Sequence, residues 1–371
     1  MKCTENYFKG LGNFFSKDYG EFLKLIPNCK QFSPDEIAYI YKALYKAMEL
    51  HDGQIRKSGE PYINHPIGAA SILASYGLDF EVVAAALLHD TIEDTAYTLK
   101  ECANDFGPNI ARLVDGATKI GRDVNNFTHK KILDNIKLDA RFIAVKAGDR
   151  LHNLYTLEAL NNEKQREIAL ETKYFYVPIA KILGIYKLKD ELQDLSLYYL
   201  DKEEFLKYYE LRKKLKQSCS KKIEEMGDIT QSSLSRNGIA MSYNYRVKNV
   251  GGICDEISCS KGTCNIEDLY AIKIILKNEK DCYLTYDIVK ELCNNVTKYT
   301  DYIKAPKNNG YKSLNINVNY KDLNIQARIR TEEMQRKNDL GVFADWDYST
   351  QDKINTDMNE GLEAFAKKIK L

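Results

Sequence analysis

The hydrophobic periodicity of the chain changes once, near residue 230, and this change separates two kinds of fold. Up to about residue 225, apolar residues recur at helical spacing. Beyond residue 230, short alternating or β-branched runs predict strands at 271–276, 314–319 and 323–329. A helix is expected over 283–294. We therefore expect an all-helical first half and a small mixed α/β second half, connected by a long charged helix at 202–225.

Capping residues fix several helix ends in the first half. Ser33 and Glu36 form a capping box around a proline, and Asp79 is placed to cap a helix that runs to His89. Two further helices are expected over 140–160 and 169–183, the second ended by a glycine.

Composition narrows the class of protein. The chain has 371 residues, with 54 Lys and Arg against 53 Asp and Glu, so its net charge of +1 excludes a polyanion binder that works by bulk charge. No apolar run of membrane-spanning length occurs, and the N-terminus has no signal-peptide core. An odd number of cysteines, nine, is typical of a reducing compartment, so we expect a cytoplasmic protein that binds neither membrane nor nucleic acid.

Four ionisable residues follow the apolar run 82–88 directly. They are His89, Asp90, Glu93 and Asp94. If the helix continues through them, His89 and Glu93 share one face, and so do the two aspartates. Charge at the end of a core helix is costly unless a cation or a partner offsets it.

Two other segments contain candidates for the rest of a metal site. His65 precedes a proline at the start of a helix, and Asp149 lies in the apolar helix 140–160. Two imidazoles and two carboxylates suit manganese or another first-row divalent ion better than a structural zinc. Such an ion lowers the pKa of water and favours phosphoester hydrolysis.

The motifs at 56–66, 89–94, 114–119 and 146–157 resemble the hydrolase half of the RelA/SpoT homologues, an HD-type phosphohydrolase domain. The resemblance implies removal of pyrophosphate from the 3′ position of (p)ppGpp with one Mn²⁺. It implies metal ligands at His65, His89, Asp90 and Asp149, and water activation by Glu93 and Asp94. It also implies a nucleotide pocket lined by Arg56, Lys57, Ser58, Asn153 and Thr156. Tyr62 and Leu157 are expected in the core, and 114–119 in a packing turn.

The second half resembles the synthetase domain of the same family, which transfers pyrophosphate from ATP to GDP or GTP. The residues that carry the likeness lie at 302–314, at 268–273 and at 329–331. It implies that Arg246 and Lys248 bind ATP phosphates, that Asp268 binds Mg²⁺ and that Tyr311 stacks on guanine.

The residues that differ from the synthetase pattern are ones expected to take part in its reaction. Gln326 replaces a glutamate, and an amide neither binds magnesium well nor accepts the proton of an attacking hydroxyl. Asn315 and Asp345 replace histidines, and Lys273 replaces an arginine. We therefore expect a degenerate synthetase that persists as a structural partner or a nucleotide sensor.

The expected division is a hydrolase domain at 1–195, a connecting helix at 196–228 and an inactive synthetase-like domain at 229–371. Because the sequence ends before the regulatory domains of longer family members, contact with the ribosome is not expected. Cys254, Cys259 and Cys264 are spaced too widely for a zinc knuckle and are expected as free thiols in a loop.

Three alternatives remain. The chain could be a bifunctional synthetase and hydrolase, or a non-catalytic nucleotide-binding regulator. It could also hydrolyse another 3′- or 2′-phosphorylated nucleotide, such as NADPH.

Overall fold

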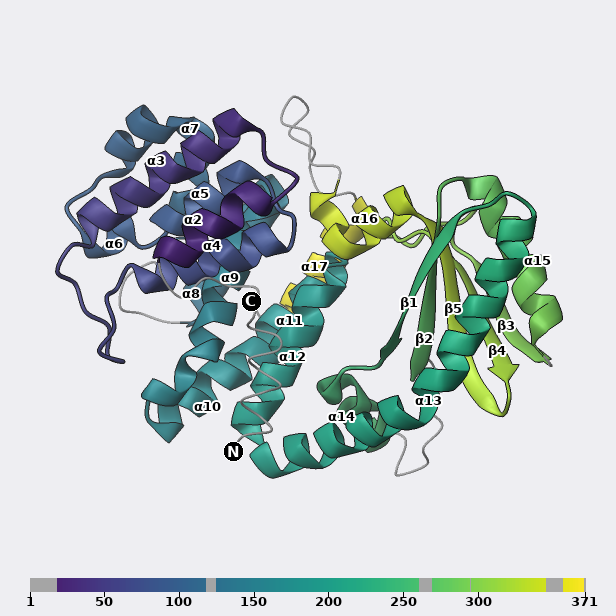
Figure 1. Ribbon diagram of the computed structural model, residues 1–371. Coiled ribbons are helices and arrows are strands. Elements are labelled where there is room, and N and C mark those ends of the chain that lie inside the picture. Colours follow the sequence, from purple (N-terminus) through teal and green to yellow (C-terminus); the bar gives the residue numbers. More distant parts are fainter. Residues whose placement is uncertain (1–18, 118–124, 260–268, 294, 345–355, 370–371) are drawn as a thin grey trace. The chain divides into compact units, whose positions relative to one another are not determined.

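The computed structural model describes residues 19–117, 125–259, 269–293, 295–344 and 356–369. These residues form two compact units (Figure 1). One comprises the described residues of Met1–Ile182 and Asp345–Leu371, and the other comprises Leu183–Ala344. No helix in the described part of the chain is long and apolar enough to cross a membrane.

The first unit is helical. Its helices are α2 (Tyr19–Leu25), α3 (Pro34–Leu50), α4 (Asn64–Ser75), α5 (Phe80–Leu88), α6 (Thr91–Asp94), α7 (Leu99–Ala117), α8 (Asn125–Leu138), α9 (Arg141–Tyr155), α10 (Asn162–Glu171), α11 (Val177–Ile182) and α17 (Thr356–Lys368). Short 3₁₀ turns occupy Ile26–Asn28 and Leu157–Ala159. The capping residues explain the starts of two helices, because Ser33 closes its capping box with Glu36 and the Asp79 carboxylate accepts from the Val82 amide.

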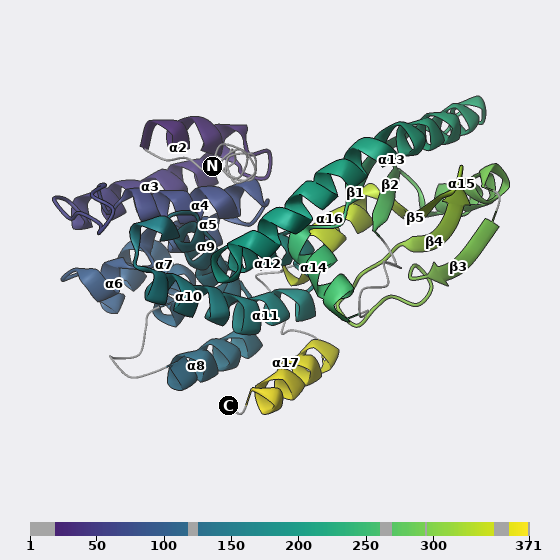
Figure 2. The ribbon, with the colours of Figure 1, turned by 90° about the horizontal axis from the view of Figure 1, so that it is seen from below.

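The core of the first unit lies where α4, α5 and α9 meet. These three helices pack against one another, and α5 is buried from Glu81 to Leu88. The last helix, α17, returns to this unit and packs against α8 and α11 (Figure 2). The core therefore fixes the positions of the three helices that carry the metal-ligand candidates.

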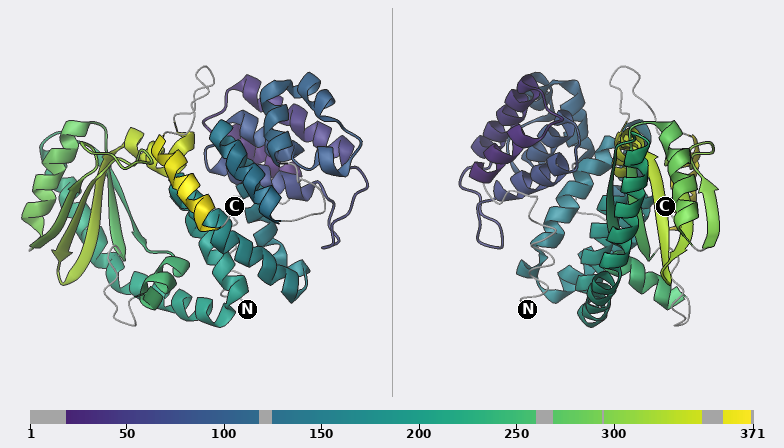
Figure 3. Two further views of the ribbon diagram at one scale, coloured as in Figure 1. Left: turned by 180° about the vertical axis from the view of Figure 1, so that it is seen from behind. Right: turned by 45° about the vertical axis from the view of Figure 1, so that its right-hand side comes forward.

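The second unit contains α12 (Tyr186–Leu200), α13 (Lys202–Arg236), α14 (Val250–Cys259), α15 (Glu279–Leu292) and α16 (Glu332–Leu340), followed by a 3₁₀ turn at Gly341–Phe343. Its strands are β1 (Met241–Val247), β2 (Tyr270–Leu276), β3 (Asn295–Asp301), β4 (Leu314–Tyr320) and β5 (Leu323–Thr331). They form one mixed sheet of order β1-β2-β5-β4-β3, labelled in Figure 1 and seen from behind in Figure 3. Among these described strands, β2 and β5 are the one parallel pair.

One face of this sheet is apolar and the other is polar. Ile316 and Val318 of β4 and Ala327 of β5 are buried in the same core as Ile223 of α13 and Val289 of α15. The alternate residues of β2, β4 and β5 are mainly Lys, Arg, Asn and Gln. The polar face of the sheet therefore carries the side chains that the synthetase likeness concerns.

The predicted fold class, a helical domain followed by a mixed-sheet domain, is confirmed. The contacts divide the chain differently from the expected boundaries at 195 and 228. Both α12 and α13 belong to the second unit, and α17 belongs to the first. The long helix is not a connector alone, because Cys219, Ile223 and Met226 enter the core of the second unit.

The expected helix at 169–183 is confirmed in extent but is irregular. It consists of the end of α10, a π-helical turn at Thr172–Tyr176 and α11. The condition that the helix ending at Leu88 continues through Asp94 is not met, because His89 and Asp90 form a turn between α5 and α6.

Candidate metal centre and nucleotide pocket

Four side chains from three segments of the first unit meet in one buried cluster. His65 lies in the first turn of α4, His89 caps the end of α5, Asp90 follows it, and Asp149 lies on α9. His65 Nε2 is 3.2 Å from Asp149 Oδ1 and 3.6 Å from Asp90 Oδ2. His89 Nε2 is 3.1 Å from Asp90 Oδ2 and 3.9 Å from Asp149 Oδ1.

The chemistry of this cluster fits a divalent cation. One ligand atom each from His65, His89 and Asp149 lies within 4.8 Å of the other two. The His89 Nδ1–H donates to the Ala86 carbonyl oxygen at 2.8 Å, which leaves the Nε2 lone pair for the cluster. That Nε2 is buried and makes no hydrogen bond in the described structure. A cation among these atoms would satisfy it and would neutralise the carboxylates.

The charges of the cluster favour the same conclusion. Burial opposes ionisation of Asp149, but Lys146 and the imidazoles hold the pKa of this carboxyl well below its usual range. Burial lowers the pKa of His89, but Asp90 and Asp149 outweigh it and raise the pKa of His89 to about 9. The two carboxylates thus attract a positive charge to the position of His89 Nε2, and a metal ion would take the place of the proton.

The expected water-activating residues lie beside the cluster. Glu93 is half-buried and Asp94 is exposed, both on the single-turn helix α6. The Tyr62 hydroxyl lies 2.8 Å from both Asp90 Oδ2 and Asp94 Oδ2. Tyr62 therefore ties a proposed metal ligand to a proposed proton acceptor.

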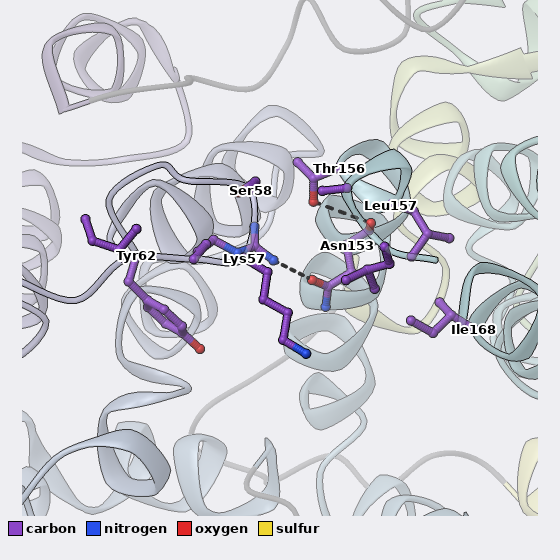
Figure 4. A pocket seen from close by; sticks show the side chains of 11 residues that line it. Lys57, Ser58, Tyr62, Asn153, Thr156, Leu157 and Ile168 are labelled. Atoms are coloured by element: carbon purple, nitrogen blue, oxygen red, sulfur yellow. Dashed lines mark hydrogen bonds between the residues drawn. The ribbon is translucent and has the colours of Figure 1, made fainter. Parts of the chain in front are cut away.

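A pocket of about 270 Å³ opens beside these residues (Figure 4). The tight turn before α4 presents Arg56, Lys57 and Ser58 to it, and Gly59, at a φ of +86°, allows that turn. Asn153 and Thr156 enter from the end of α9. All five expected nucleotide-pocket residues line this one pocket.

A hydrogen-bonded chain joins the pocket to the cluster. Arg56 Nη2 donates to Asn153 Oδ1 at 3.0 Å, and Asn153 Nδ2 donates to Asp149 Oδ1 at 2.5 Å. Arg56 on the pocket wall is therefore linked to Asp149 through one intervening amide.

Two residues near the cluster were misread or missed from the sequence. Tyr62 was expected in the core, but it lines the pocket and bonds the acidic residues. Lys146 is buried, lies 3.3 Å from Asp149 Oδ2 and donates to the Ala117 carbonyl at 2.9 Å. The helical spacing between Lys146 and Asp149 was the signal that could have identified this ion pair. Leu157, also expected in the core, is buried and contributes to the pocket wall.

The segment expected as a packing turn, 114–119, is described only to residue 117. There it forms the end of α7, where Val114 is buried. Asp268, Asp345 and Cys264 lie outside the described residues, as does the side chain of Cys259. Cys254, which forms no disulfide, is buried on α14 instead of lying in a loop.

The expected synthetase-site residues Gln326, Arg246 and Lys248 each contact other side chains of the second unit. Gln326 Oε1 accepts from Arg328 Nε at 2.6 Å, and Gln326 Nε2 donates to Asn317 Oδ1 at 3.1 Å. Arg246 Nη1 is 3.5 Å from Asp190 Oδ2, and Lys248 pairs with Glu256.

Tyr311, the expected guanine-stacking residue, is buried, with 8% of its surface exposed. Its hydroxyl accepts from Arg330 Nη2 at 3.0 Å. Lys307 Nζ and the Arg330 guanidinium carbon lie 5.0 Å and 5.2 Å from its ring centroid. Cationic side chains of the chain itself thus already surround this ring.

Comparisons with known proteins cover both units. The model of the family described as "HD domain" matches residues 43–186, and that described as "Region found in RelA / SpoT proteins" matches residues 245–353. The chain is 36% identical over 339 residues to a GTP pyrophosphokinase of Myxococcus xanthus. It is 36% identical over 323 residues to a guanosine-3′,5′-bis(diphosphate) 3′-pyrophosphohydrolase of Haemophilus influenzae.

A third relative, the bifunctional (p)ppGpp synthase/hydrolase SpoT of Escherichia coli, is 33% identical over 334 residues. These three matches cover 87%, 83% and 87% of this chain, but 44%, 47% and 47% of the relatives. The chain therefore spans about half the length of the curated relatives that it matches.

Proposed function

Because the chain belongs to the RelA/SpoT family and its first unit is an HD domain, we propose that this unit hydrolyses the 3′-pyrophosphate of (p)ppGpp, with GDP or GTP and pyrophosphate as products. The observation that carries the proposal is the convergence of His65, His89, Asp90 and Asp149 on one buried point. Manganese is the ion we propose, since two imidazoles and two carboxylates suit it.

These four residues would hold the ion, which would supply positive charge to the phosphate oxygens and acidify the attacking water. The water oxygen bonds to the phosphorus attached to the 3′ oxygen, and the bond between that phosphorus and the 3′ oxygen breaks. Glu93, with Asp94 beside it, accepts one proton of the water, and this proton is then delivered to the 3′ oxygen, which leaves as a hydroxyl. Tyr62 orients Asp94 for this step by its 2.8 Å hydrogen bond.

The pocket matches a nucleotide that carries phosphates at two positions. Arg56 and Lys57 place two cationic groups on its wall, and guanidinium and ammonium groups bind phosphate oxygens. Ser58, Asn153 and Thr156 add hydrogen-bonding groups, while Leu157 and Ile168 give an apolar surface for a base (Figure 4).

The direct test is incubation of the purified chain with ppGpp and Mn²⁺, followed by chromatography of the products. We expect GDP and pyrophosphate in equal amounts. Asp90→Asn and Glu93→Gln should each lower the rate by more than about 100-fold, because they remove a metal ligand and a proton acceptor. Asp105→Asn is the matched control, since this carboxylate bonds Tyr97 in the same unit, outside the cluster.

A different result would contradict the choice of ppGpp as the substrate. If ppGpp stays intact with Mn²⁺, Mg²⁺ and Co²⁺ while NADPH or another 3′- or 2′-phosphorylated nucleotide is hydrolysed, the substrate is wrong. If no phosphorylated nucleotide is hydrolysed, the chain is a binding regulator and the proposed reaction fails.

For the second unit, we propose that pyrophosphate transfer from ATP has been lost. The sheet position of the catalytic glutamate of the family is Gln326, whose amide is bonded on both sides by Arg328 and Asn317. Lys273, Arg328 and Asn315 lie side by side in the register of β2, β5 and β4. These described positions thus lack a carboxylate that could bind magnesium or accept the proton of a hydroxyl.

The test uses the variant Asp90→Asn. Because this variant should not hydrolyse (p)ppGpp, any (p)ppGpp that it synthesises would accumulate. We expect no (p)ppGpp from ATP and GDP or GTP with Mg²⁺, and we expect the added substitution Gln326→Glu to restore none, because Asn315 and Lys273 also differ from the family. Accumulation of (p)ppGpp in the Asp90→Asn variant would make the chain bifunctional, as the Escherichia coli relative is named.

A further inference from the structure

A third buried imidazole, which the proposed reaction does not use, contacts the metal cluster. His152 lies on α9 and is 4% exposed, and its Nδ1 is 2.9 Å from the Nδ1 of His65. The rings are inclined at 58°, with centroids 4.9 Å apart, so the two nitrogens meet edge to edge instead of stacking. Because the nitrogen of His65 that faces the carboxylates is Nε2, His152 holds the opposite side of that ring.

A glycine on α4 leaves the space that this ring occupies. Gly68 lies on α4, one turn after His65, where a Cβ would come within 2.1 Å of His152 Cδ2 and 2.3 Å of its Nε2. These distances are far below van der Waals contact, so only glycine allows α9 to bring His152 against His65. The contact between the two imidazoles therefore depends on glycine at position 68.

The bond between the two Nδ1 atoms restricts where the protons reside. When both rings are neutral, one Nδ1 must donate and the other must accept. Without a metal ion, Asp149 Oδ1 at 3.2 Å favours a proton on His65 Nε2, so His65 Nδ1 accepts from His152. With a cation at His65 Nε2, that nitrogen carries no proton, and His65 must instead donate from Nδ1.

We propose that His152 is a positioning residue that exchanges its tautomer with that of His65 when the metal ion binds. The proton between the two rings passes from His152 Nδ1 to His65 Nδ1, the proton on His65 Nε2 leaves, and His152 takes up one proton at Nε2. The number of protons on the pair is unchanged. An imidazole suits this position because its ring nitrogen changes from donor to acceptor without a rotation of the side chain. The inference rests on the metal centre of the proposed function.

The first experiment needs no variant. The chain has only five histidines, so ¹⁵N-histidine labelling gives a small set of ring signals, in which each tautomer has distinct nitrogen shifts. We expect His152 to carry its proton on Nδ1 without metal and on Nε2 after saturation with Zn²⁺, used as a diamagnetic probe. A His152 tautomer that stays the same on saturation would overturn the proposal.

The second experiment measures Mn²⁺ affinity by titration calorimetry. His152→Phe keeps a ring but removes the bond, and we expect it to weaken Mn²⁺ binding by about 10- to 100-fold. His152→Asn places a polar atom near the position of Nδ1 and should recover part of this loss. Gly68→Ala should weaken binding similarly, because it displaces the ring while retaining both imidazoles.

Gly227→Ala on α13 is the matched control for packing damage. Its Cβ would meet the Tyr243 ring of β1 at 2.4 Å, so it introduces the same kind of clash in the second unit, away from the cluster. It should destabilise the fold without changing the affinity for Mn²⁺. If wild type binds Mn²⁺ and the affinities of His152→Phe and Gly68→Ala lie within twofold of the wild-type value, the proposed role of His152 is wrong. The proposed metal centre is then unaffected. If wild type binds no divalent ion, both fail.

Discussion

At the scale of single residues, hydrogen bonds to the side of the ring away from the cluster fix which nitrogen each histidine offers. His89 donates from Nδ1 to a carbonyl oxygen of its own helix, and His65 meets another imidazole through Nδ1. Both therefore direct Nε2 to Asp90 and Asp149. A metal ligand of this kind needs an oriented ring as well as the right residue type.

Tyr62 gives a prediction at this scale. Tyr62→Phe removes the hydroxyl that bonds Asp90 and Asp94 but keeps the ring, which stacks on His51 at 4.8 Å between centroids. Since a hydrogen bond to a charged group is worth about 1.5–3 kcal/mol, we expect ppGpp hydrolysis to slow by about 10-fold or more, with little change in thermal stability. The measurement is kcat with Mn²⁺ at saturation.

Tyr97→Phe is the control for Tyr62→Phe. The Tyr97 hydroxyl also bonds an aspartate, Asp105, at 2.8 Å, but outside the cluster. Its loss should leave kcat unchanged. Equal rates for Tyr62→Phe and wild type would show that Tyr62 only packs.

The sequence alone predicted which residues belong to the site better than it predicted the hydrogen bonds between them. The spacing of His89, Asp90, Glu93 and Asp94 after an apolar run indicated charge at the end of a core helix, as found. Tyr62 gave no such signal, because an aromatic residue near a helix start is compatible with a core position. The bond from His152 to His65 joins residues 87 apart in the chain and depends on the close approach of two helices.

At the scale of elements, the sequence predicted the three interior strands of the sheet but not its two edge strands. β2, β4 and β5 have two neighbours each, and alternating or β-branched runs mark them. β1 and β3 are the edges of the sheet, and their burial patterns do not alternate regularly. An edge strand of mixed exposure carries no clear period of two, which explains why both were missed.

The π-helical turn at Thr172–Tyr176 was beyond the reach of a helical pattern, since a period of 3.6 assumes regular turns. It follows Glu171, which bonds His129 at 2.9 Å and Arg150 at 2.5 Å. Burial raises the pKa of Glu171, but His129 and Arg150 outweigh it and lower this pKa to about 2. The irregular turn is thus anchored by an ion network that begins next to Asp149.

At the scale of the whole molecule, the HD domain and the RelA/SpoT-type domain differ at their candidate sites. In the first unit, ligand atoms of His65, His89 and Asp149 lie within 4.8 Å of one another. In the second unit, the polar face of the sheet carries cations, and the amide of Gln326 stands where we propose that a catalytic carboxylate has been lost. The proposal that the chain removes the 3′-pyrophosphate and does not add it rests on this difference.

The most direct measurement is an anomalous difference map from a crystal soaked in Mn²⁺. We expect a single strong peak in the first unit, within coordination distance of Nε2 of His65 and of His89 and of a carboxylate oxygen each from Asp90 and Asp149. The peak should disappear in Asp149→Asn. A wild-type map with no peak among these four side chains, or with the four turned away from one another, would contradict the proposed metal centre.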